Sequence, residues 1–256
     1  MKTKKYLNGL TGLLVLSIVA VGCKKEVVPA EFESISFDAA EVLEKLPVGL
    51  TSSNDASAKE CVGFIESALD MTLFIDNMKV PEDAQKSAKK STSGADEWHW
   101  SWHFGGESFT FYWTYDEDAS RKNWSMDIQF GAGPRYDYVD AWESKDGGEG
   151  EVMYNFTWAY IYSGESMEDY EALFWKYTWE LDNSGAYKFN WFYESEDLEY
   201  NYYLHYDITI NPDGSGTIDY YSMDALFYQS EWDVLGKGSW TYYLGDFEQS
   251  GIWTVG

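Results

Sequence analysis

Aromatic and aliphatic residues recur at every second position along most of residues 94–256. The first run, Trp98, Trp100 and Trp102, is followed by similar runs that are separated by short segments rich in Gly, Asp, Asn and Pro. A period of two residues is typical of β-strands, and connections this short join neighbouring antiparallel strands. The pattern predicts an antiparallel meander of about ten to twelve strands, which twist should bend into a strongly curved sheet, a half-barrel or a barrel.

Residues 37–93 show a helical pattern instead. Residues 38–41 and 57–60 each have the spacing of a capping box, with Asp or Ser followed three positions later by Glu. Beyond the second box, apolar positions cover more than half of the helix circumference, so this helix should be buried on more than one side. A polar helix is expected over residues 82–90. The helices are predicted to pack on or inside the curved sheet.

The first 22 residues have the features of a secretory signal peptide. Three lysines precede an apolar run at residues 10–21, which is well short of the roughly 20 residues that a membrane-spanning helix needs. The motif AVGC at residues 20–23 resembles the lipobox of bacterial lipoproteins, although Ala20 stands where that family prefers Leu. The resemblance implies cleavage before Cys23, lipidation of its thiol and attachment to a membrane through the lipid.

The residues after Cys23 indicate the membrane to which the mature protein is expected to be sorted. The tract Lys24-Lys25-Glu26 lacks the Asp that directs proteobacterial lipoproteins to the inner membrane, and it resembles surface-export signals of Bacteroidota lipoproteins. We therefore expect an outer-membrane lipoprotein of the cell envelope, facing either the periplasm or the cell surface. A curved sheet around an N-terminal helix also resembles, in layout alone, the lipoprotein-carrier and lipocalin-like envelope families. No motif of either family aligns, so the resemblance implies no site residue.

Composition narrows the range of partners. The chain has 44 acidic against 18 basic residues and a formal net charge of −26, and removal of the signal peptide would make the balance still more acidic. Nucleic acid and anionic lipid headgroups are therefore disfavoured as partners. With Cys23 lipidated, only Cys61 remains, so the mature chain can form no internal disulfide. The apolar neighbours of Cys61 predict a buried thiol rather than a nucleophile.

Motifs for metal, cofactor or nucleophile chemistry are absent from the sequence. In a strand, His99 and His103 would stand about 13 Å apart, too far to share one zinc ion. Residues 211–216 begin like a calcium loop, but Ser222 stands where the bidentate Glu is required. Neither a nucleophile elbow nor a nucleotide-binding loop occurs. We predict no metal and no cofactor, and a hydrolytic carboxylate pair stays open because acidic residues are so numerous.

A second set of aromatic residues falls between the core positions of the strands, on the opposite face of the sheet. Exposed aromatic surface usually marks an interaction site, so the candidate ligand-binding residues are Tyr112, Phe192, Tyr203, Tyr221 and Tyr243. The leading hypothesis is a non-enzymatic lipoprotein that binds a ligand or partner protein of the envelope through this face. Two alternatives are a carrier for a lipid or other apolar small molecule, and surface glycan binding or hydrolysis.

The expected organisation has four parts, and the sequence identifies neither the ligand nor the number of subunits. They are a signal peptide at residues 1–22, the lipidated cysteine and a tether at 23–36, a helical segment at 37–93 and the aromatic-rich β domain at 94–256.

Overall fold

The computed structural model describes residues 33–70, 80–81, 83–87, 95–104, 106–156, 170–197 and 201–255. Its helices are α2 (Ala39–Leu43), α3 (Val48–Thr51) and α4 (Ala56–Asp70). The strands are β1 (Gln85–Lys86), β2 (Asp96–Phe104), β3 (Glu107–Glu117), β4 (Arg121–Phe130), β5 (Arg135–Ser144), β6 (Glu149–Asn155), β7 (Tyr170–Leu181), β8 (Tyr187–Asp197), β9 (Asn201–Ile210), β10 (Gly216–Ser222), β11 (Ala225–Trp232), β12 (Gly238–Leu244) and β13 (Phe247–Trp253).

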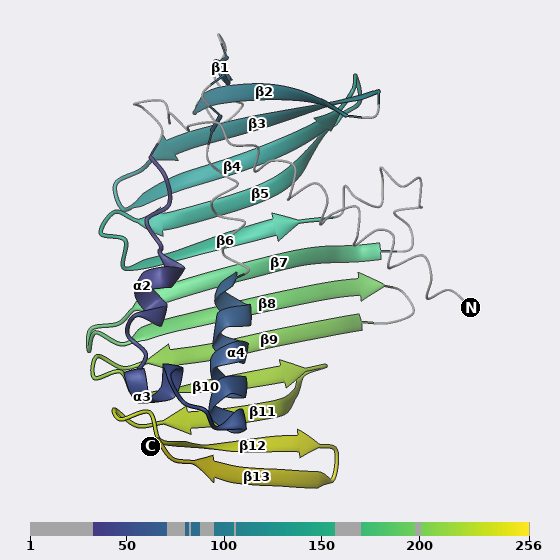
Figure 1. Ribbon diagram of the computed structural model, residues 1–256. Helices are drawn as coiled ribbons and strands as arrows, with labels where there is room; N and C mark the ends of the chain where they lie inside the picture. Colours follow the sequence, from purple (N-terminus) through teal and green to yellow (C-terminus); the bar gives the residue numbers. More distant parts are fainter. Residues whose placement is uncertain are drawn as a thin grey trace.

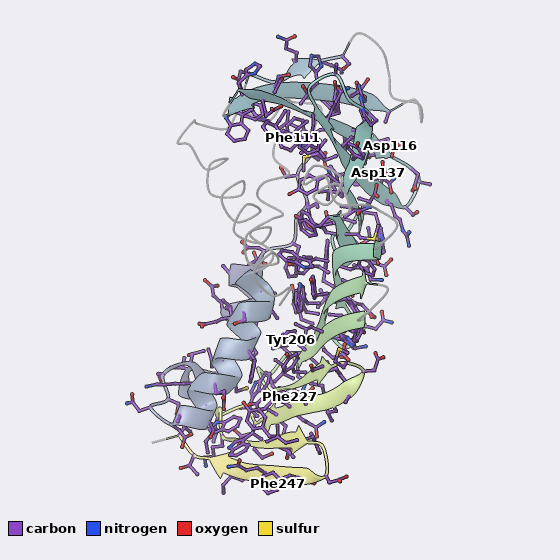
Figure 2. The ribbon with its side chains drawn as sticks, turned by 90° about the vertical axis from the view of Figure 1, so that its right-hand side faces the viewer. Phe111, Asp116, Asp137, Tyr206, Phe227 and Phe247 are labelled. Carbon is purple, nitrogen blue, oxygen red and sulfur yellow. The ribbon has the colours of Figure 1, made fainter. Side chains whose placement is uncertain are left out.

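These thirteen described strands form one sheet in which each strand is antiparallel to the next along the chain (Figure 1). The predicted curved meander is therefore confirmed. The sheet does not close, because β1 and β13 lie at its two edges. Seen from the side, both ends of the sheet bend toward α4 (Figure 2). We call the face that α4 contacts the concave face and the opposite one the convex face.

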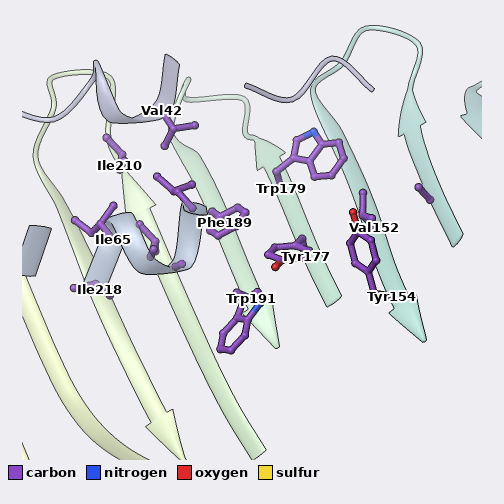
Figure 3. Close-up of a cluster of buried hydrophobic side chains, with 14 of the residues drawn as sticks. Val42, Ile65, Val152, Tyr154, Tyr177, Trp179, Phe189, Trp191, Ile210 and Ile218 are labelled. Carbon is purple, nitrogen blue, oxygen red and sulfur yellow. The ribbon is translucent and has the colours of Figure 1, made fainter. Parts of the chain in front are cut away.

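The concave face carries the core. Register places the three tryptophans of β2 opposite apolar residues of β3, with Trp98 facing Trp113. Helix α4 packs its apolar side on the same face, and Ile65 lies fully buried against the strands that hold Ile210 and Ile218 (Figure 3). This burial explains why the helix has so many apolar positions, since only an apolar side can cover an aromatic sheet.

Five hairpin turns lie at the same end of the sheet, and an aspartate closes each of them. In every case the Asp Oδ1 accepts a hydrogen bond from the backbone N–H two residues later, which is the geometry of an Asx turn. The distances are between 2.7 and 3.1 Å. The five residues are Asp118, Asp146, Asp182, Asp213 and Asp233.

The segment before α4 runs along these turns (Figure 1). Ser36 donates from its backbone N–H and from its hydroxyl to Oε1 of Glu143, a carboxylate that is only 1% exposed. Phe37 packs on the ring of Trp179 with a centroid distance of 5.0 Å. At Gly236, a Cβ would lie 2.2 Å from the backbone nitrogen of Leu50 in α3. The turns and the N-terminal segment therefore fit together at backbone contact distance.

Several local predictions are wrong. Asp55 rather than Ser57 caps α4, because its Oδ1 accepts from the backbone N–H of Ser57. The polar helix expected at residues 82–90 is replaced, at Gln85–Lys86, by strand β1 paired with β2. Phe227 falls between core positions, so alternation predicts it on the opposite face, but a bulge in β11 turns its ring toward Tyr242 on the concave face. Residues 71–79, 82 and 88–93 of the predicted helical segment lie outside the described residues.

A pair of glycine substitutions tests the packing of the N-terminal segment against the turns. Gly236 and Gly245 both have positive φ, at 85° and 65°, but only Gly236 approaches another segment. Gly245→Ala should lower the free energy of unfolding by about 1 kcal/mol, the strain of a left-handed alanine. Gly236→Ala should cost about 1–3 kcal/mol more because the methyl group overlaps α3. Urea denaturation measures both, and equal losses would contradict the described contact.

Candidate functional site

The convex face carries all five residues predicted to bind ligand. Each of the five is half-buried and alternates with a concave-face neighbour. The structure brings three of them, Phe192, Tyr203 and Tyr221, together around His205 on β8, β9 and β10. Tyr112 lies on β3 and Tyr243 on β12, so neither joins this group. Cys23 lies outside the described residues.

The His205 cluster, which we define as Phe192, Tyr203, His205 and Tyr221, is a cross-strand stack. The imidazole lies 4.1 Å from the Phe192 ring and 5.2 Å from the Tyr221 ring, and the planes are within 21° of parallel. His205 Nε2 is 2.6 Å from Oδ1 of Asp207, two residues along β9. Because the rings stack on one another, they present mainly their edges and hydroxyl groups outward.

Basic side chains lie over three rings of the convex face, one of them in the His205 cluster. The guanidinium carbon of Arg135 lies 3.3 Å from the centre of the Tyr112 ring, and that of Arg121 lies 3.7 Å from the Trp142 ring. Lys176 Nζ lies 5.3 Å from the centre of the Phe192 ring. These are cation–π contacts. The predicted binders Tyr112 and Phe192, and likewise Trp142, therefore already have an intramolecular partner on one ring face.

A hollow of about 270 Å³ opens on the convex face between β3 and β6. This volume lies just below the range of small-molecule sites, about 300–1,000 Å³. Figure 2 shows Asp116, at its rim, on the side of the sheet away from α4. The side chains of the convex face that line it are Thr114, Asp116, Asn123, Ser125, Asp140, Trp142 and Glu151.

The hollow combines one large ring with short polar groups. In register, Asn123 lies opposite Trp142, which in turn lies opposite Glu151, so the indole stands between an amide and a carboxylate. Asn123 Nδ2 donates to Oδ1 of Asp116 at 3.0 Å. The side chains next to the half-buried Trp142 are short, and the space above them, bordered by the indole ring, is the hollow. A ligand here would meet a ring, an amide and carboxylate oxygens.

The sequence pattern did not identify this hollow. Tyr136, Tyr138 and Trp142 are all even positions, so strict alternation would place Trp142 with the core. A bulge changes the phase, because Met126 pairs with Val139 while the next residue of β4 pairs with residue 137. Trp142 is thereby moved to the convex face. The sequence held one signal of this change: Trp142 is an even position, whereas Val139 and Ala141, the apolar residues just before it, are odd.

Acidic groups lie close together beside the hollow. Partial burial, and the neighbouring carboxylate of Asp137, raise the pKa of Asp127 to about 6, although Arg135 opposes the shift. Asp140 lies in the same group, and burial together with Asp137 also raises its pKa. This part of the convex face therefore concentrates negative charge.

The concave face beneath α4 is filled by protein side chains. Phe64 lies 4.7 Å from the Tyr228 ring, and Cys61 is fully buried beside it. Burial raises the pKa of the Cys61 thiol to about 11, so the thiol stays protonated at neutral pH. The carrier hypothesis would require space on this face, and the part under α4 is occupied.

Comparisons of the chain with protein-family models, with curated proteins and with solved structures found no match. The candidate site is therefore defined by the side chains of this chain alone. Within the described part of the chain, no helix is both long enough and apolar enough to cross a membrane.

The raised pKa of Asp127 predicts a pH-dependent effect on stability. The folded protein holds this proton more tightly than the unfolded chain, whose aspartates titrate near 3.9. Ionisation of Asp127 should therefore lower stability progressively from about pH 4 to pH 6, with the full loss present above that range. Urea denaturation of wild type and Asp127→Asn should show the variant gaining relative stability as the pH rises from 4 to 7. A difference that stays constant over this range would contradict the shift.

Proposed function

We propose that this chain is a lipid-anchored protein of the bacterial cell envelope that binds a glycan on the convex face of its sheet. The observation that carries the proposal is the hollow beside Trp142, on the face that the described helices leave uncovered. The proposed role is binding, and no catalytic step is assigned to the carboxylates.

The lining of the hollow favours a polyhydroxylated ligand over an apolar one. A sugar ring offers a face of C–H groups, which an indole can cover, and hydroxyl groups that both donate and accept hydrogen bonds. Trp142 supplies the ring, and Asn123 and Asp140 supply amide and carboxylate oxygens. An apolar molecule would leave these polar groups without partners, which disfavours its binding.

A lipid anchor at Cys23 is compatible with glycan binding in the hollow. Cys23 precedes the first described residue, Glu33, by about ten residues, which span at most roughly 35 Å when fully extended. The backbone carbonyl of Glu33 accepts a hydrogen bond from Trp124 Nε1, and Lys122 Nζ lies 2.6 Å from the Glu33 carboxylate. A lipid on Cys23 would therefore hold the sheet close to the membrane, within reach of envelope glycans.

Glycan-array binding of the mature chain tests the proposal. The wild-type surface should bind at least one glycan class, and Trp142→Ala should weaken that binding at least roughly tenfold because the stacking ring is lost. Tyr243→Ala is the matched control, since it removes an aromatic side chain from the same face outside the hollow. That variant should bind like the wild type.

Two results would contradict the glycan proposal. One is an array on which the folded wild type binds nothing. The other is binding that Trp142→Ala leaves intact while Tyr203→Ser and Tyr221→Ser remove it, which would assign recognition to the His205 cluster. Circular dichroism of each variant establishes that the sheet is retained.

The anchor is tested separately in a bacterial host. Cys23→Ser should abolish incorporation of a labelled fatty acid and should move the protein from the membrane fraction to the soluble fraction, because one residue carries the whole attachment. Label that persists in Cys23→Ser, or wild-type protein without label, would contradict lipidation.

A further inference from the structure

The charge of the hollow indicates which glycans it would accept. Three of its side chains are carboxylates, Asp116, Asp140 and Glu151. Asp116 accepts a hydrogen bond from a neutral amide, and Glu151 is paired with Lys176, whose Nζ lies 3.8 Å from the carboxylate. Among the described residues, no cation or hydrogen-bond donor contacts Asp140. At least one carboxylate of the hollow is therefore available to a ligand cation.

The basic side chains near the hollow already have partners. Tryptophan is the best aromatic partner for cation–π contacts, and Trp142 already holds the Arg121 guanidinium over its ring. Arg135 is likewise committed, to Tyr112 and to the carboxylate of Glu97, with Nη1 and Oε2 2.7 Å apart. The bases of this region are thus held by their own rings and acids rather than by Asp140.

We propose that the hollow selects sugars that carry a free, protonated amine, with the ammonium group on the Asp140 carboxylate and the sugar ring beside Trp142. This inference rests on the proposed glycan-binding function and specifies its ligand class. N-acetylation would remove the ligand's charge and lose the ion pair. Uronic acids and sulfated sugars would be repelled by the hollow and by the net charge of −26.

Isothermal titration calorimetry of the mature Cys23→Ser protein can test the amine. The probes are a glucosamine oligomer, its fully N-acetylated counterpart and a uronic acid oligomer of the same length. The glucosamine oligomer should bind at least roughly tenfold more tightly than the N-acetylated form, and added salt should reduce this preference. The uronic acid oligomer should not bind.

Matched variants separate a built site from general attraction to an acidic protein. Asp140→Asn should reduce the preference for the amine to less than about twofold. Asp219→Asn removes one carboxylate from the same face in β10, where Gln229 Nε2 donates to it at 2.8 Å, and should leave the preference unchanged. Equal loss in both variants would show non-specific attraction and would overturn the inference.

The outcomes also distinguish the two proposals. Equal affinity for the free-amine and N-acetylated oligomers would overturn the amine inference and leave glycan binding in place. Absence of binding by all three oligomers, together with a silent glycan array, would overturn both. Amine-selective binding that Asp140→Asn retains would place the ammonium elsewhere and overturn the assignment of Asp140.

Discussion

The fold depends on the burial of one aromatic face. A single layer of thirteen strands has two faces, and the rings of the concave face would be exposed to water without a covering layer. The N-terminal segment supplies part of that layer in two ways. Helix α4 places Ile65 and Phe64 against the strands of the C-terminal half, while Phe37 packs on Trp179 and Phe189. The sheet is curved in the matching direction, because both of its ends bend toward the helix (Figure 2).

Covering one face leaves the other free for recognition. The convex face is built from residues that alternate with the core, and it combines half-buried rings with charged side chains. Arg121 lies on the Trp142 ring, and Arg135 and Lys176 each contact both a ring and a carboxylate. Among the described residues, no cation therefore contacts the Asp140 carboxylate on β5. Part of the acidic excess of the chain thus lies beside the hollow, which is where the proposed ligand would bind.

Sequence patterns predicted the sheet because alternation and turn residues are local signals. The runs at Trp98 and Phe109, and the aspartate-containing turns, required no knowledge of distant contacts. The bulges in β5 and β11 were not predictable in this way. Each adds one residue between paired positions, and the extra residue moved Phe227 to the concave face and Trp142 to the convex face. The same limit explains why the convex tyrosines were identified while the hollow was missed.

The packing of α4 on the concave face can be tested most directly with a disulfide. Ser230 Oγ lies 3.5 Å from the Cys61 sulfur, so Ser230→Cys would place two thiols side by side across the helix–sheet interface. In the mature Cys23→Ser background, mild oxidation followed by alkylation in denaturant and intact-mass measurement should show a chain with no alkylated thiol and two fewer hydrogens. A chain that takes up two alkyl groups after oxidation, with both thiols also reactive in the folded protein, would contradict this packing.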